Sequence, residues 1–444
     1  MFRCIRYVYS LFRLNRDETD ENLERTKQAA KRCGAVGQKL LQLLVSNDGF
    51  LTPENRNKLS YVFENNDVHN MADTFGMYRE DFGRPLHHDF VVTEDVPVGS
   101  GTIGQVYKFY QKDLGIDVAV KVKHPDVDAQ ATKFARSLLN ILWGIECFYT
   151  LPFAVLLKEY LVNISLQLDY AQEADTTMKM YDKFKSESHI VIPKIYGHSK
   201  RFIIMSYHDG TSFEDIIDER MRKMVSIDIY FFMMASIICY DIIHCDLHRG
   251  NWKVSVKSGT YKLIIYDFGL TTSLGSMTKH VSLVMLNNNI MDMAKVMVTS
   301  WETEPKWREL AKYVSEIESR SVKVFTDRYE LILRKGLLIG IPLNINVLRM
   351  LQGGNMCMNV VNCTRDSLNK VLGKHGGNCT EVMLCYNLGL LDKIKKYKEL
   401  GIVIAQWIDE DPAIKQVYDD WLEDTYGHKD GSIFVDITVD GLVF

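Results

Sequence analysis

The stretches "IIHCDLHRGN" at residues 242–251 and "LIIYDFGL" at residues 263–270 decide the fold of this chain. Asp246 and Asn251 have the D-x-x-x-x-N spacing, and Asp267 opens a D-F-G tripeptide. Enzymes that transfer a phosphoryl group use this pattern, because the reaction depends mainly on positioning and on neutralising charge. We therefore predict that Asp246 is the catalytic acid/base, and that Asn251 and Asp267 supply the hard oxygen ligands that Mg²⁺ prefers.

A glycine-rich stretch, "GSGTIGQVYK" at residues 99–108, lies upstream of these motifs. It fits G-x-G-x-x-G-x-V, and glycine lets phosphate oxygens approach backbone N–H groups because it has no Cβ atom. A dinucleotide fold would need a helix after the glycines, whereas "QVYKFYQ" has the composition of a strand, which favours a kinase-type hairpin. The predicted nucleotide-binding residues of this loop are Gly99, Ser100, Gly101, Thr102, Gly104 and Val106.

An interior lysine is predicted at Lys121, within the alternating β-branched stretch "VAVKV". A charge in a central strand needs a partner, and in kinases this lysine binds the α- and β-phosphates and pairs with a helix glutamate. We select Glu173, in "LDYAQEAD", as that glutamate. The alternative for Lys121 is a side chain that reaches solvent from the end of a strand. The alternative for Glu173 is a position on a solvated acidic face of its helix. The adenine is expected near Met205, Tyr207 and His208, after the strand "RFIIM".

The order of β-rich and helical runs predicts an α+β fold with the two lobes of a protein kinase. Residues 89–122 consist of short β-rich runs, and most of the chain after Ser212 has helical periodicity. We expect a small β-rich N-lobe and a larger helical C-lobe, preceded by an N-terminal helical extension. The predicted segments are 1–18 (basic amphipathic segment), 19–88 (helical extension), 89–210 (N-lobe with a helical insert) and 211–444 (C-lobe with catalytic loop, D-F-G and C-terminal tail).

The composition of this 444-residue chain restricts its partners and its location. A formal net charge of −4 without a basic stripe argues against nucleic acid as a partner. Nine cysteines spread along the chain favour a reducing, intracellular compartment. Buried thiols are the default, and the alternative is a metal site formed by Cys357, Cys363, Cys379 and Cys385, with His375 between the pairs. No apolar run reaches the roughly 20 residues of a membrane-spanning helix, so we expect a cytoplasmic or peripheral membrane protein, with a mitochondrial location left open.

The first sixteen residues, "MFRCIRYVYSLFRLNR", contain four arginines and no acidic residue. At helical spacing the arginines share one arc, and an apolar set falls on another side. The arginines are Arg3, Arg6, Arg13 and Arg16, and the apolar set is Met1, Ile5, Val8 and Phe12. This pattern predicts a basic amphipathic helix that contacts a membrane surface or serves as a transit-type leader. The alternative is a terminal helix that packs on its own domain.

Several motifs together resemble the UbiB family of atypical kinase-like proteins, the aarF-domain group. They are "GQKLLQLL" at 37–44, "IGQVYK" at 103–108, "VAVKVKHPDV" at 118–127 and "LQLDYAQEAD" at 166–175, together with "HCDLHRGN" and D-F-G. The resemblance implies a kinase-like fold, binding of ATP and Mg²⁺, and a helical extension packed over the active site. It also implies a role in isoprenoid-quinone or other lipid metabolism, often at mitochondrial or plastid membranes.

The sequence departs from this family pattern at three places. The Lys-x-Gly-Gln of the extension is Ala35-Val36-Gly37-Gln38, and the Glu-x-Asp before the helix glutamate is Gln167-Leu168-Asp169. The alanine-rich nucleotide loop is Gly99-Ser100-Gly101-Thr102. Loss of both members of an ion pair leaves no orphan charge, so the first two changes are compatible with each other. We predict a less occluded site and a more conventional phosphate loop.

Two further features concern the phosphate acceptor. His248 occupies the position of the usual catalytic-loop lysine, as in small-molecule phosphotransferases, and no A-P-E follows the D-F-G. An ordinary kinase uses that segment as a platform for peptides, so general Ser/Thr/Tyr substrates are disfavoured. We predict a phosphotransferase or ATPase that uses ATP and Mg²⁺ on a lipid-related, small-molecule or protein acceptor. The alternatives are a small-molecule kinase of the aminoglycoside or choline type and a nucleotide-binding regulatory protein with little turnover.

Overall fold

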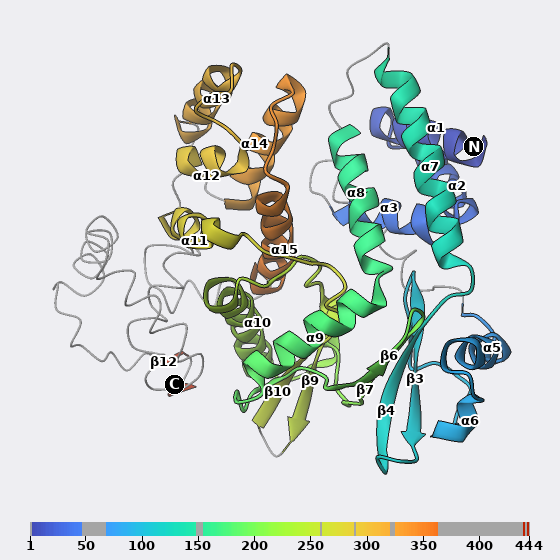
Figure 1. Cartoon of the computed structure of the whole chain (residues 1–444). Helices are drawn as coiled ribbons and strands as arrows, with labels where there is room; N and C mark the ends of the chain where they lie inside the picture. The colour runs from blue at the N-terminus through green and yellow to red at the C-terminus, as the bar shows by residue number, and fades with distance from the viewer. Residues whose placement is uncertain are drawn as a thin grey trace. The chain divides into compact units, whose positions relative to one another are not determined.

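The computed structural model describes residues 2–46, 68–147, 154–257, 260–287, 290–319, 325–362, 438–439 and 442–443. The chain divides into two compact units. Unit 1 comprises residues 1–179, 193–208 and 268–270, and unit 2 comprises 180–192, 209–267 and 271–444. The predicted α+β class is confirmed, because helices and an antiparallel sheet are both present (Figure 1).

The sheet of unit 1 is antiparallel and has the order β1-β3-β4-β7-β6, with β2 paired to β3. Val118, Val120 and Val122 of β4 are buried together on one face, as expected for a period of two. Two short helices, α5 and α6, lie beside this sheet (Figure 1). The strands are β1 Phe90–Val91, β2 Gly99–Ser100, β3 Gly104–Gln111, β4 Ile116–Lys123, β6 Ile195–His198 and β7 Phe202–Ser206, and the helices are α5 Met71–Phe82 and α6 Leu86–Asp89.

Helix α5 is fixed at both ends and along its buried face. The Asn70 side chain accepts a hydrogen bond from the Ala72 N–H, and Gly83 ends the helix in the left-handed region at φ 70°. Tyr78 stacks on Phe82 with ring centroids 4.4 Å apart, inside the hydrophobic cluster of the sheet. These contacts fix the direction in which the chain enters α5, and therefore the position of the residues immediately before the helix.

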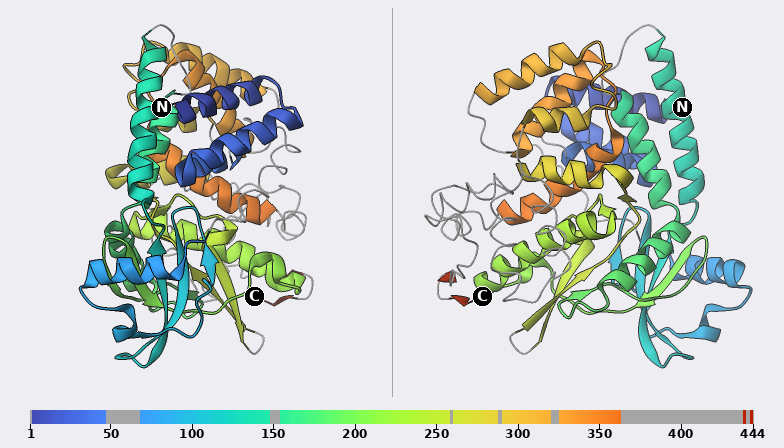
Figure 2. Two further views of the ribbon diagram at one scale, coloured as in Figure 1. Left: turned by 90° about the vertical axis from the view of Figure 1, so that its right-hand side faces the viewer. Right: turned by 60° about the vertical axis from the view of Figure 1, so that its left-hand side comes forward.

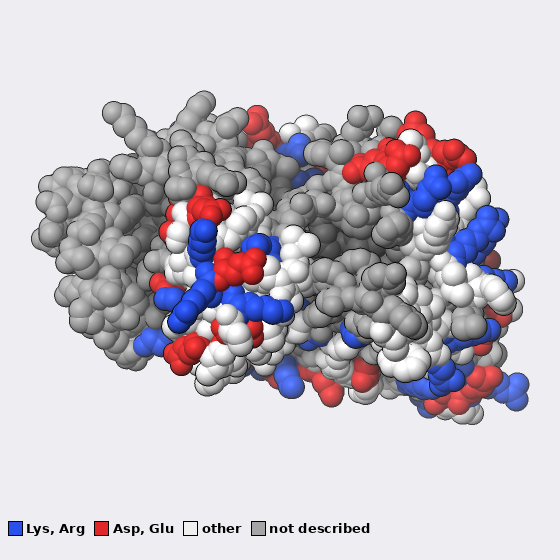
Figure 3. All heavy atoms as spheres, turned by 90° about the horizontal axis from the view of Figure 1, so that it is seen from above, with Lys and Arg blue, Asp and Glu red and all other residues white. Residues whose placement is uncertain are grey.

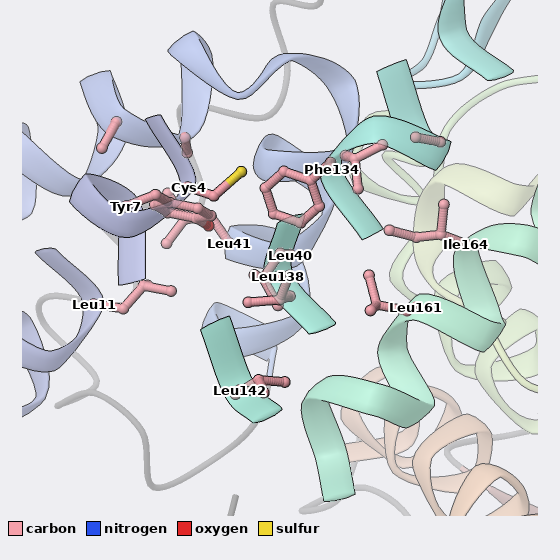
Figure 4. Close-up of a cluster of buried hydrophobic side chains, with 14 of the residues drawn as sticks. Cys4, Tyr7, Leu11, Leu40, Leu41, Phe134, Leu138, Leu142, Leu161 and Ile164 are labelled. Atoms are coloured by element: carbon pink, nitrogen blue, oxygen red, sulfur yellow. The ribbon is translucent and has the colours of Figure 1, made fainter. Parts of the chain in front are cut away.

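A helical module forms the rest of unit 1. Its helices are α1 Phe2–Arg16, α2 Asp20–Arg32, α3 Gly34–Ser46, α7 Val127–Glu146 and α8 Ala154–Gln167, and α9 Tyr170–Phe184 continues from it into unit 2. Helix α1 packs along α2, and α3 packs on both α2 and α7 (Figure 2). One hydrophobic core joins them, with Leu40 of α3, Phe134 and Leu138 of α7 and Leu161 of α8 (Figure 4).

Helix α1 forms as predicted, but its buried face differs from the predicted apolar side. Cys4, Tyr7, Leu11 and Leu14 are buried, whereas Ile5 is exposed and Val8 is only partly buried. The side chains of Met1 and Phe12 lie outside the described residues. The choice between two adjacent apolar arcs is made by the contacts with α2 and α7, including the hydrogen bond from Tyr7 Oη to Gly37 O at 2.8 Å. Arg3, Arg6 and Arg13 remain exposed.

Unit 2 is mainly helical and is built around α10, whose residues 228–238 are all buried. Its helices are α10 Glu219–Tyr240, α11 Thr278–Asn287, α12 Ile290–Met297, α13 Trp307–Ser319, α14 Phe325–Ile339 and α15 Ile345–Asn362, with the 3-10 turns η2 Phe213–Asp215, η3 Arg249–Asn251 and η4 Gly275–Met277. Its strands are β5 Ile190–Val191, β8 Ile243–His244, β9 Trp252–Lys257, β10 Thr260–Ile265, β11 Thr271–Thr272, β12 Thr438–Val439 and β13 Leu442–Val443. The strands form a three-stranded sheet of order β5-β10-β9 and a separate pair, β11-β8. The two predicted motifs, at residues 242–251 and 263–270, lie within or next to these strands.

Several surface predictions can be compared with the structure. In the described part of the chain, no helix is both long enough and apolar enough to cross a membrane. Cys357 is buried on α15, and the other three cysteines of the hypothetical metal site, with His375, lie outside the described residues. On the face drawn in Figure 3, basic and acidic side chains are interspersed. Opposite charges also pair locally, as between Arg25 and Glu21 on α2, at 2.5 Å.

The core of the helical module provides a test with neighbouring residues of α7. Leu138 is fully buried, whereas Leu139 is 41% exposed. Leu138→Ala should destabilise unit 1 by about 2–5 kcal/mol, because it removes buried methyl groups and leaves a cavity. Leu139→Ala should change stability by no more than about 0.5 kcal/mol. Urea denaturation followed by fluorescence and circular dichroism measures both, and equal effects would show that the packing of α7 is wrong.

Candidate functional site

The glycine-rich loop is a hairpin between β2 and β3. Gly99 lies opposite Val106 in the β2–β3 register, and Val106 lies opposite Lys121 in the β3–β4 register. The turn itself is closed by a hydrogen bond from Gly101 N to Gly104 O at 2.8 Å. The register therefore places the loop directly beside the lysine that the sequence assigned to the nucleotide phosphates.

The three glycines of this loop are not equivalent. A Cβ atom at Gly104 would lie 2.6 Å from Tyr170 Oη and even closer to the carbonyl oxygen of Val122, so a side chain cannot be accommodated there. A Cβ atom at Gly99 would meet nothing within 4 Å, and one at Gly101 would be in ordinary contact with Gly104 O. Close packing therefore requires glycine only at the last of the three positions.

Lys121 and Glu173 form the ion pair on which the candidate site is centred. Lys121 Nζ lies 2.6 Å from Glu173 Oε1, with the two side chains 15% and 4% exposed. Lys121 is held by a central strand, and Glu173 lies in the first turn of α9, where the helix dipole favours a negative charge. Buried charges of this kind persist only when they are paired, so the sheet and α9 must be placed together.

Tyr170, the first residue of α9, is a component of the site that the sequence reasoning missed. The ammonium groups of Lys121 and Lys123 lie 5.2 Å and 5.1 Å from the centroid of its ring, within the range of cation–π attraction. Lys123 also pairs with Asp128 at 3.0 Å. The signal was present in "LDYAQEAD", since the tyrosine lies one turn before the glutamate, but only the fold shows that it also restricts Gly104.

The residues predicted to contact adenine lie at the end of the 193–208 segment of unit 1. Met205 lies at the end of β7 and packs against the small cluster of Tyr170, Ala174 and Ile203. Tyr207 lies under the ammonium of Lys108 at 4.7 Å from the ring centroid. His208 Nε2 is 2.8 Å from Ser206 Oγ. All three predicted residues are partly exposed, which a ligand contact requires.

In unit 2 the loop of residues 246–251, predicted to be catalytic, folds back on itself. The Asp246 carbonyl accepts hydrogen bonds from His248 N at 2.9 Å and from Asn251 Nδ2 at 2.8 Å. The second bond orients the Asn251 amide. Tyr266 N donates to Asn251 O at 2.8 Å, so the residue before Asp267 is attached to the end of the loop. The structure thus brings together the three predicted residues Asp246, Asn251 and Asp267 within unit 2.

His244 links the loop of Asp246 to the chain just before Asp267. Its Nε2 donates to Tyr266 O at 3.2 Å, and its Nδ1 accepts from Asp246 N at 3.3 Å. Because a carbonyl can only accept and an amide can only donate, both bonds require the neutral imidazole. Burial lowers the pKa of His244, against smaller opposing contributions from Tyr266 O, Asp246 and Asp267, so the neutral form is maintained. The sequence motifs alone indicate no role for His244.

Asp267 and Asn251 fit a magnesium ion by their chemistry. Both supply hard oxygen donors, and Asp267 adopts φ 56° in the left-handed region, which is uncommon for a residue other than glycine. Such strained backbone concentrates at functional sites. His248 Nε2 lies 3.9 Å from Asp246 Oδ2, which places a titratable group beside the predicted catalytic carboxylate.

The segment after D-F-G is short and is fixed by one aspartate. Asp241 has φ 50°, and its carboxylate accepts hydrogen bonds from Leu274 N and Gly275 N at 2.8 Å and from Thr278 Oγ1 at 2.6 Å. Strand β11 pairs with β8, and α11 begins at Thr278. Between D-F-G and α11 lie the short strand β11 and the turn η4, and Asp241 attaches the start of α11 to the end of α10.

The predicted site residues thus form two groups, each described within its own unit. The glycine-rich loop, Lys121, Glu173 and the three adenine-contact residues belong to unit 1, and Asp246, Asn251 and Asp267 belong to unit 2. Their roles towards a nucleotide or a metal remain predictions.

Comparison with known families matches residues 62–300 of this chain to the ABC1 atypical kinase-like domain. The matched region contains both groups of predicted site residues. "AarF domain-containing protein kinase 1" of Xenopus tropicalis is 30% identical over 247 residues, which cover 53% of this chain and 46% of that protein.

Two further relatives show the same partial coverage. "Probable serine/threonine-protein kinase abkB" of Dictyostelium discoideum is 27% identical over 289 residues, covering 60% of this chain and 43% of that protein. "ABC1 family protein MCP2" of Saccharomyces cerevisiae is 28% identical over 218 residues, covering 44% and 37%. The matched part of this chain therefore spans less than half the length of each of these curated relatives.

The inequality of the glycines gives a prediction with a matched control. Gly104→Ala should destabilise unit 1 and weaken any nucleotide binding, because the new methyl group must displace Val122 O or the Tyr170 ring. Gly99→Ala should leave stability within about 0.5 kcal/mol of wild type, because the added atom meets open space. Thermal denaturation with and without Mg-ATP measures both effects. A Gly104→Ala protein as stable as the Gly99→Ala protein would contradict the close packing.

Proposed function

The chain belongs to the ABC1 atypical kinase-like family, and we propose that it is a phosphotransferase or ATPase that uses ATP and Mg²⁺. Membership confirms the resemblance to the UbiB/aarF group and the kinase-like fold. The observation that carries the proposal is the Lys121–Glu173 pair at 2.6 Å, which joins residues far apart in the sequence beside a glycine-rich hairpin. A structural ion pair alone would not require the loop glycines and the D-F-G motif as well.

In this proposal unit 1 binds the nucleotide phosphates. Lys121 would contact the α- and β-phosphates while Glu173 keeps its ammonium group in place. The N–H groups of the glycine-rich turn would approach phosphate oxygens, and the exclusion of a side chain at Gly104 keeps that turn against α9. Such preorganised donors contribute most where water is excluded.

Unit 2 would supply the metal ligands and the proton acceptor. Asn251 and Asp267 would hold Mg²⁺, which neutralises charge on the phosphates when bound. The Asp246 carboxylate would orient the acceptor hydroxyl and accept its proton. His244 would hold the Asp246 backbone through its neutral ring, and His248 would stand beside the carboxylate in place of the usual lysine.

The acceptor is proposed to be a lipid-related or other small molecule in preference to an extended peptide. The support is the segment after D-F-G, which Asp241 fixes directly onto α11. A peptide platform requires a longer stretch of chain at that place. Two curated relatives are named as protein kinases, so a protein acceptor is the outcome that would correct this part of the proposal.

Asp246→Asn separates catalysis from binding. The variant should bind Mg-ATP like wild type but lose single-turnover release or transfer of the γ-phosphate, because the amide cannot accept the proton. A Mg-ATP concentration 100 times the Kd should raise the free energy of unfolding by about 2.7 kcal/mol in both proteins, by linkage. Asp113→Asn, in the exposed turn after β3, is the matched control and should retain full activity.

The possible outcomes of this experiment distinguish the functional classes. Stabilisation by Mg-ATP without any turnover in wild type would support a nucleotide-binding regulatory protein. If Mg-ATP does not stabilise the wild-type protein, every function proposed above that depends on a nucleotide is wrong. Transfer to a choline- or aminoglycoside-type acceptor would identify a small-molecule kinase.

We also propose that the outer face of α1 contacts an anionic membrane surface. Phe2 is 85% exposed, and Ile5 and Tyr9 are exposed on the same side of the helix as Arg6 and Arg13. Aromatic and arginine side chains together suit the boundary between headgroups and acyl chains. The opposite face of α1 is covered by α2 and α7, so the helix is already folded when it meets a membrane.

Vesicle binding tests this surface. Vesicles of phosphatidylcholine with 30% phosphatidylserine should bind wild type more tightly than vesicles of phosphatidylcholine alone. Arg6→Gln with Arg13→Gln should weaken binding roughly 25-fold, at about 1 kcal/mol per arginine. Arg79→Gln, an exposed arginine of α5, is the control. Equal binding of the α1 double variant and the α5 variant would show that α1 is not the contact.

A further inference from the structure

A histidine after β4 holds the glycine-rich turn at two points. The backbone N of His124 donates to Ile103 O at 2.9 Å, and its ring Nε2 lies 2.9 Å from Gly101 O. A carbonyl oxygen can only accept, so His124 Nε2 carries a proton in this arrangement. Both sides of the turn closed by Gly101 and Gly104 are thus attached to one residue.

A second histidine determines the state of the first. His124 Nδ1 lies 2.9 Å from His69 Nδ1, with the rings edge to face. When His124 is neutral its Nδ1 is an acceptor, so His69 Nδ1 must donate. The remaining nitrogen, His69 Nε2, is then an acceptor for the hydroxyl of Thr74, 2.9 Å away and fully buried in the first turn of α5. Every ring nitrogen of the pair therefore has a partner of the correct kind.

The backbone of His69 is attached to the strand that leaves the glycine loop. Gln105 Oε1 accepts from His69 N at 3.0 Å, and Gln105 Nε2 donates to His69 O at 3.1 Å. Gln105 is fully buried, follows Gly104 directly, and also donates to Tyr107 Oη. A polar network in which each member is satisfied is rigid and specific, and this one extends from the buried Gln105 and Thr74 to the partly buried histidine pair. The segment just before α5 is therefore bonded to β3 through Gln105 and to the loop turn through His124.

We infer that His69 and His124 are positioning residues for the glycine-rich loop, which their directed hydrogen bonds hold in the shape that receives a nucleotide phosphate. The inference rests on the proposed function. Neither residue contacts the phosphates in this scheme. They act by reducing the number of conformations open to the hairpin loop, in which Gly99 and Gly101 are sterically unrestricted glycines.

The geometry also limits the charge of the pair. If both rings were protonated, two Nδ1–H groups would face each other at 2.9 Å, so the arrangement can hold at most one added proton. The pKa of His69 is lowered from 6.5 to about 4, mainly by burial and also by the neighbouring His124, while Asp73 of α5 partly opposes both effects. Tyr107 of β3 is the other titratable group linked to the network, through Gln105 and Thr74.

Hydrogen exchange of the loop amides tests the inference without nucleotide. His124→Leu should increase exchange at residues 101–104 at pH 7, and His124→Gln should largely restore protection, because the glutamine Nε2 can still donate to Gly101 O. His69→Leu should give an intermediate effect, because His124 keeps its bond to the loop but loses its orientation. His198→Leu, an exposed histidine of β6, should change nothing.

Nucleotide binding gives the second readout. His124→Leu should raise the Kd and KM for Mg-ATP roughly three- to tenfold, as expected for one lost hydrogen bond, with a smaller change in kcat. Unchanged exchange and unchanged Kd in His124→Leu would overturn the inference. If wild type binds no Mg-ATP, the proposed function is wrong, and the exchange arm still decides whether His124 holds the turn.

A pH comparison separates positioning from simple packing. Since the pKa of His69 is lower in the folded than in the unfolded protein, the unfolded state binds more protons between about pH 6.5 and 4, and stability falls as the pH is lowered through that window. His69→Asn should therefore lose less stability than wild type between pH 7 and pH 5. Loop exchange should also depend less on pH in this variant. Identical pH dependence in the two proteins would show that His69 is not held neutral.

Discussion

The buried pair of Lys121 and Glu173 is the constraint on which the rest of unit 1 depends. An ammonium group in a central strand loses several kcal/mol of hydration, and this cost is offset only if a carboxylate is held at hydrogen-bonding distance. Helix α9 must therefore begin close to the sheet, and Tyr170, at that beginning, lies against both lysines of β4. Its hydroxyl in turn leaves no room for a side chain at Gly104. One ion pair thus fixes the start of a helix, the identity of a loop residue and the position of the loop.

The departures from the family pattern are consistent with a central role for the Lys121–Glu173 pair. Ala35 and Gln167 stand where the family pattern has a lysine and a glutamate, whereas the pair of Lys121 and Glu173 is retained. The helical extension is held by its apolar core with α7 and α8 and by the bond from Tyr7 to Gly37, so it does not need an ion pair to stay folded. The extension and the phosphate-binding residues can therefore vary separately, which is how a family can change access to a site while it keeps the site itself.

Most of the candidate site could be predicted from the sequence because its residues lie in short motifs of fixed spacing. Asp246, Asn251 and Asp267 needed only that spacing, and Glu173 needed only a glutamate on a helix after the strand of Lys121. The buried face of α1 could not be predicted, since two apolar arcs compete and only contacts with α2 and α7 decide between them. His69 and Tyr170 were missed for the same physical reason. Their roles come from partners far away in the sequence, and no local pattern records such a partner.

The glycine-rich loop shows what this non-local information adds. Gly99 and Gly101 looked like the residues that distinguish this chain, yet both have space for a methyl group. Glycine at such positions increases the conformational entropy that must be lost when the turn is ordered. An alanine-containing loop would lose less conformational entropy on ordering, and would need fewer bonds to residues outside the loop. A loop rich in glycine can be equally well ordered only if other residues hold it, and His124 supplies two such bonds from outside the motif.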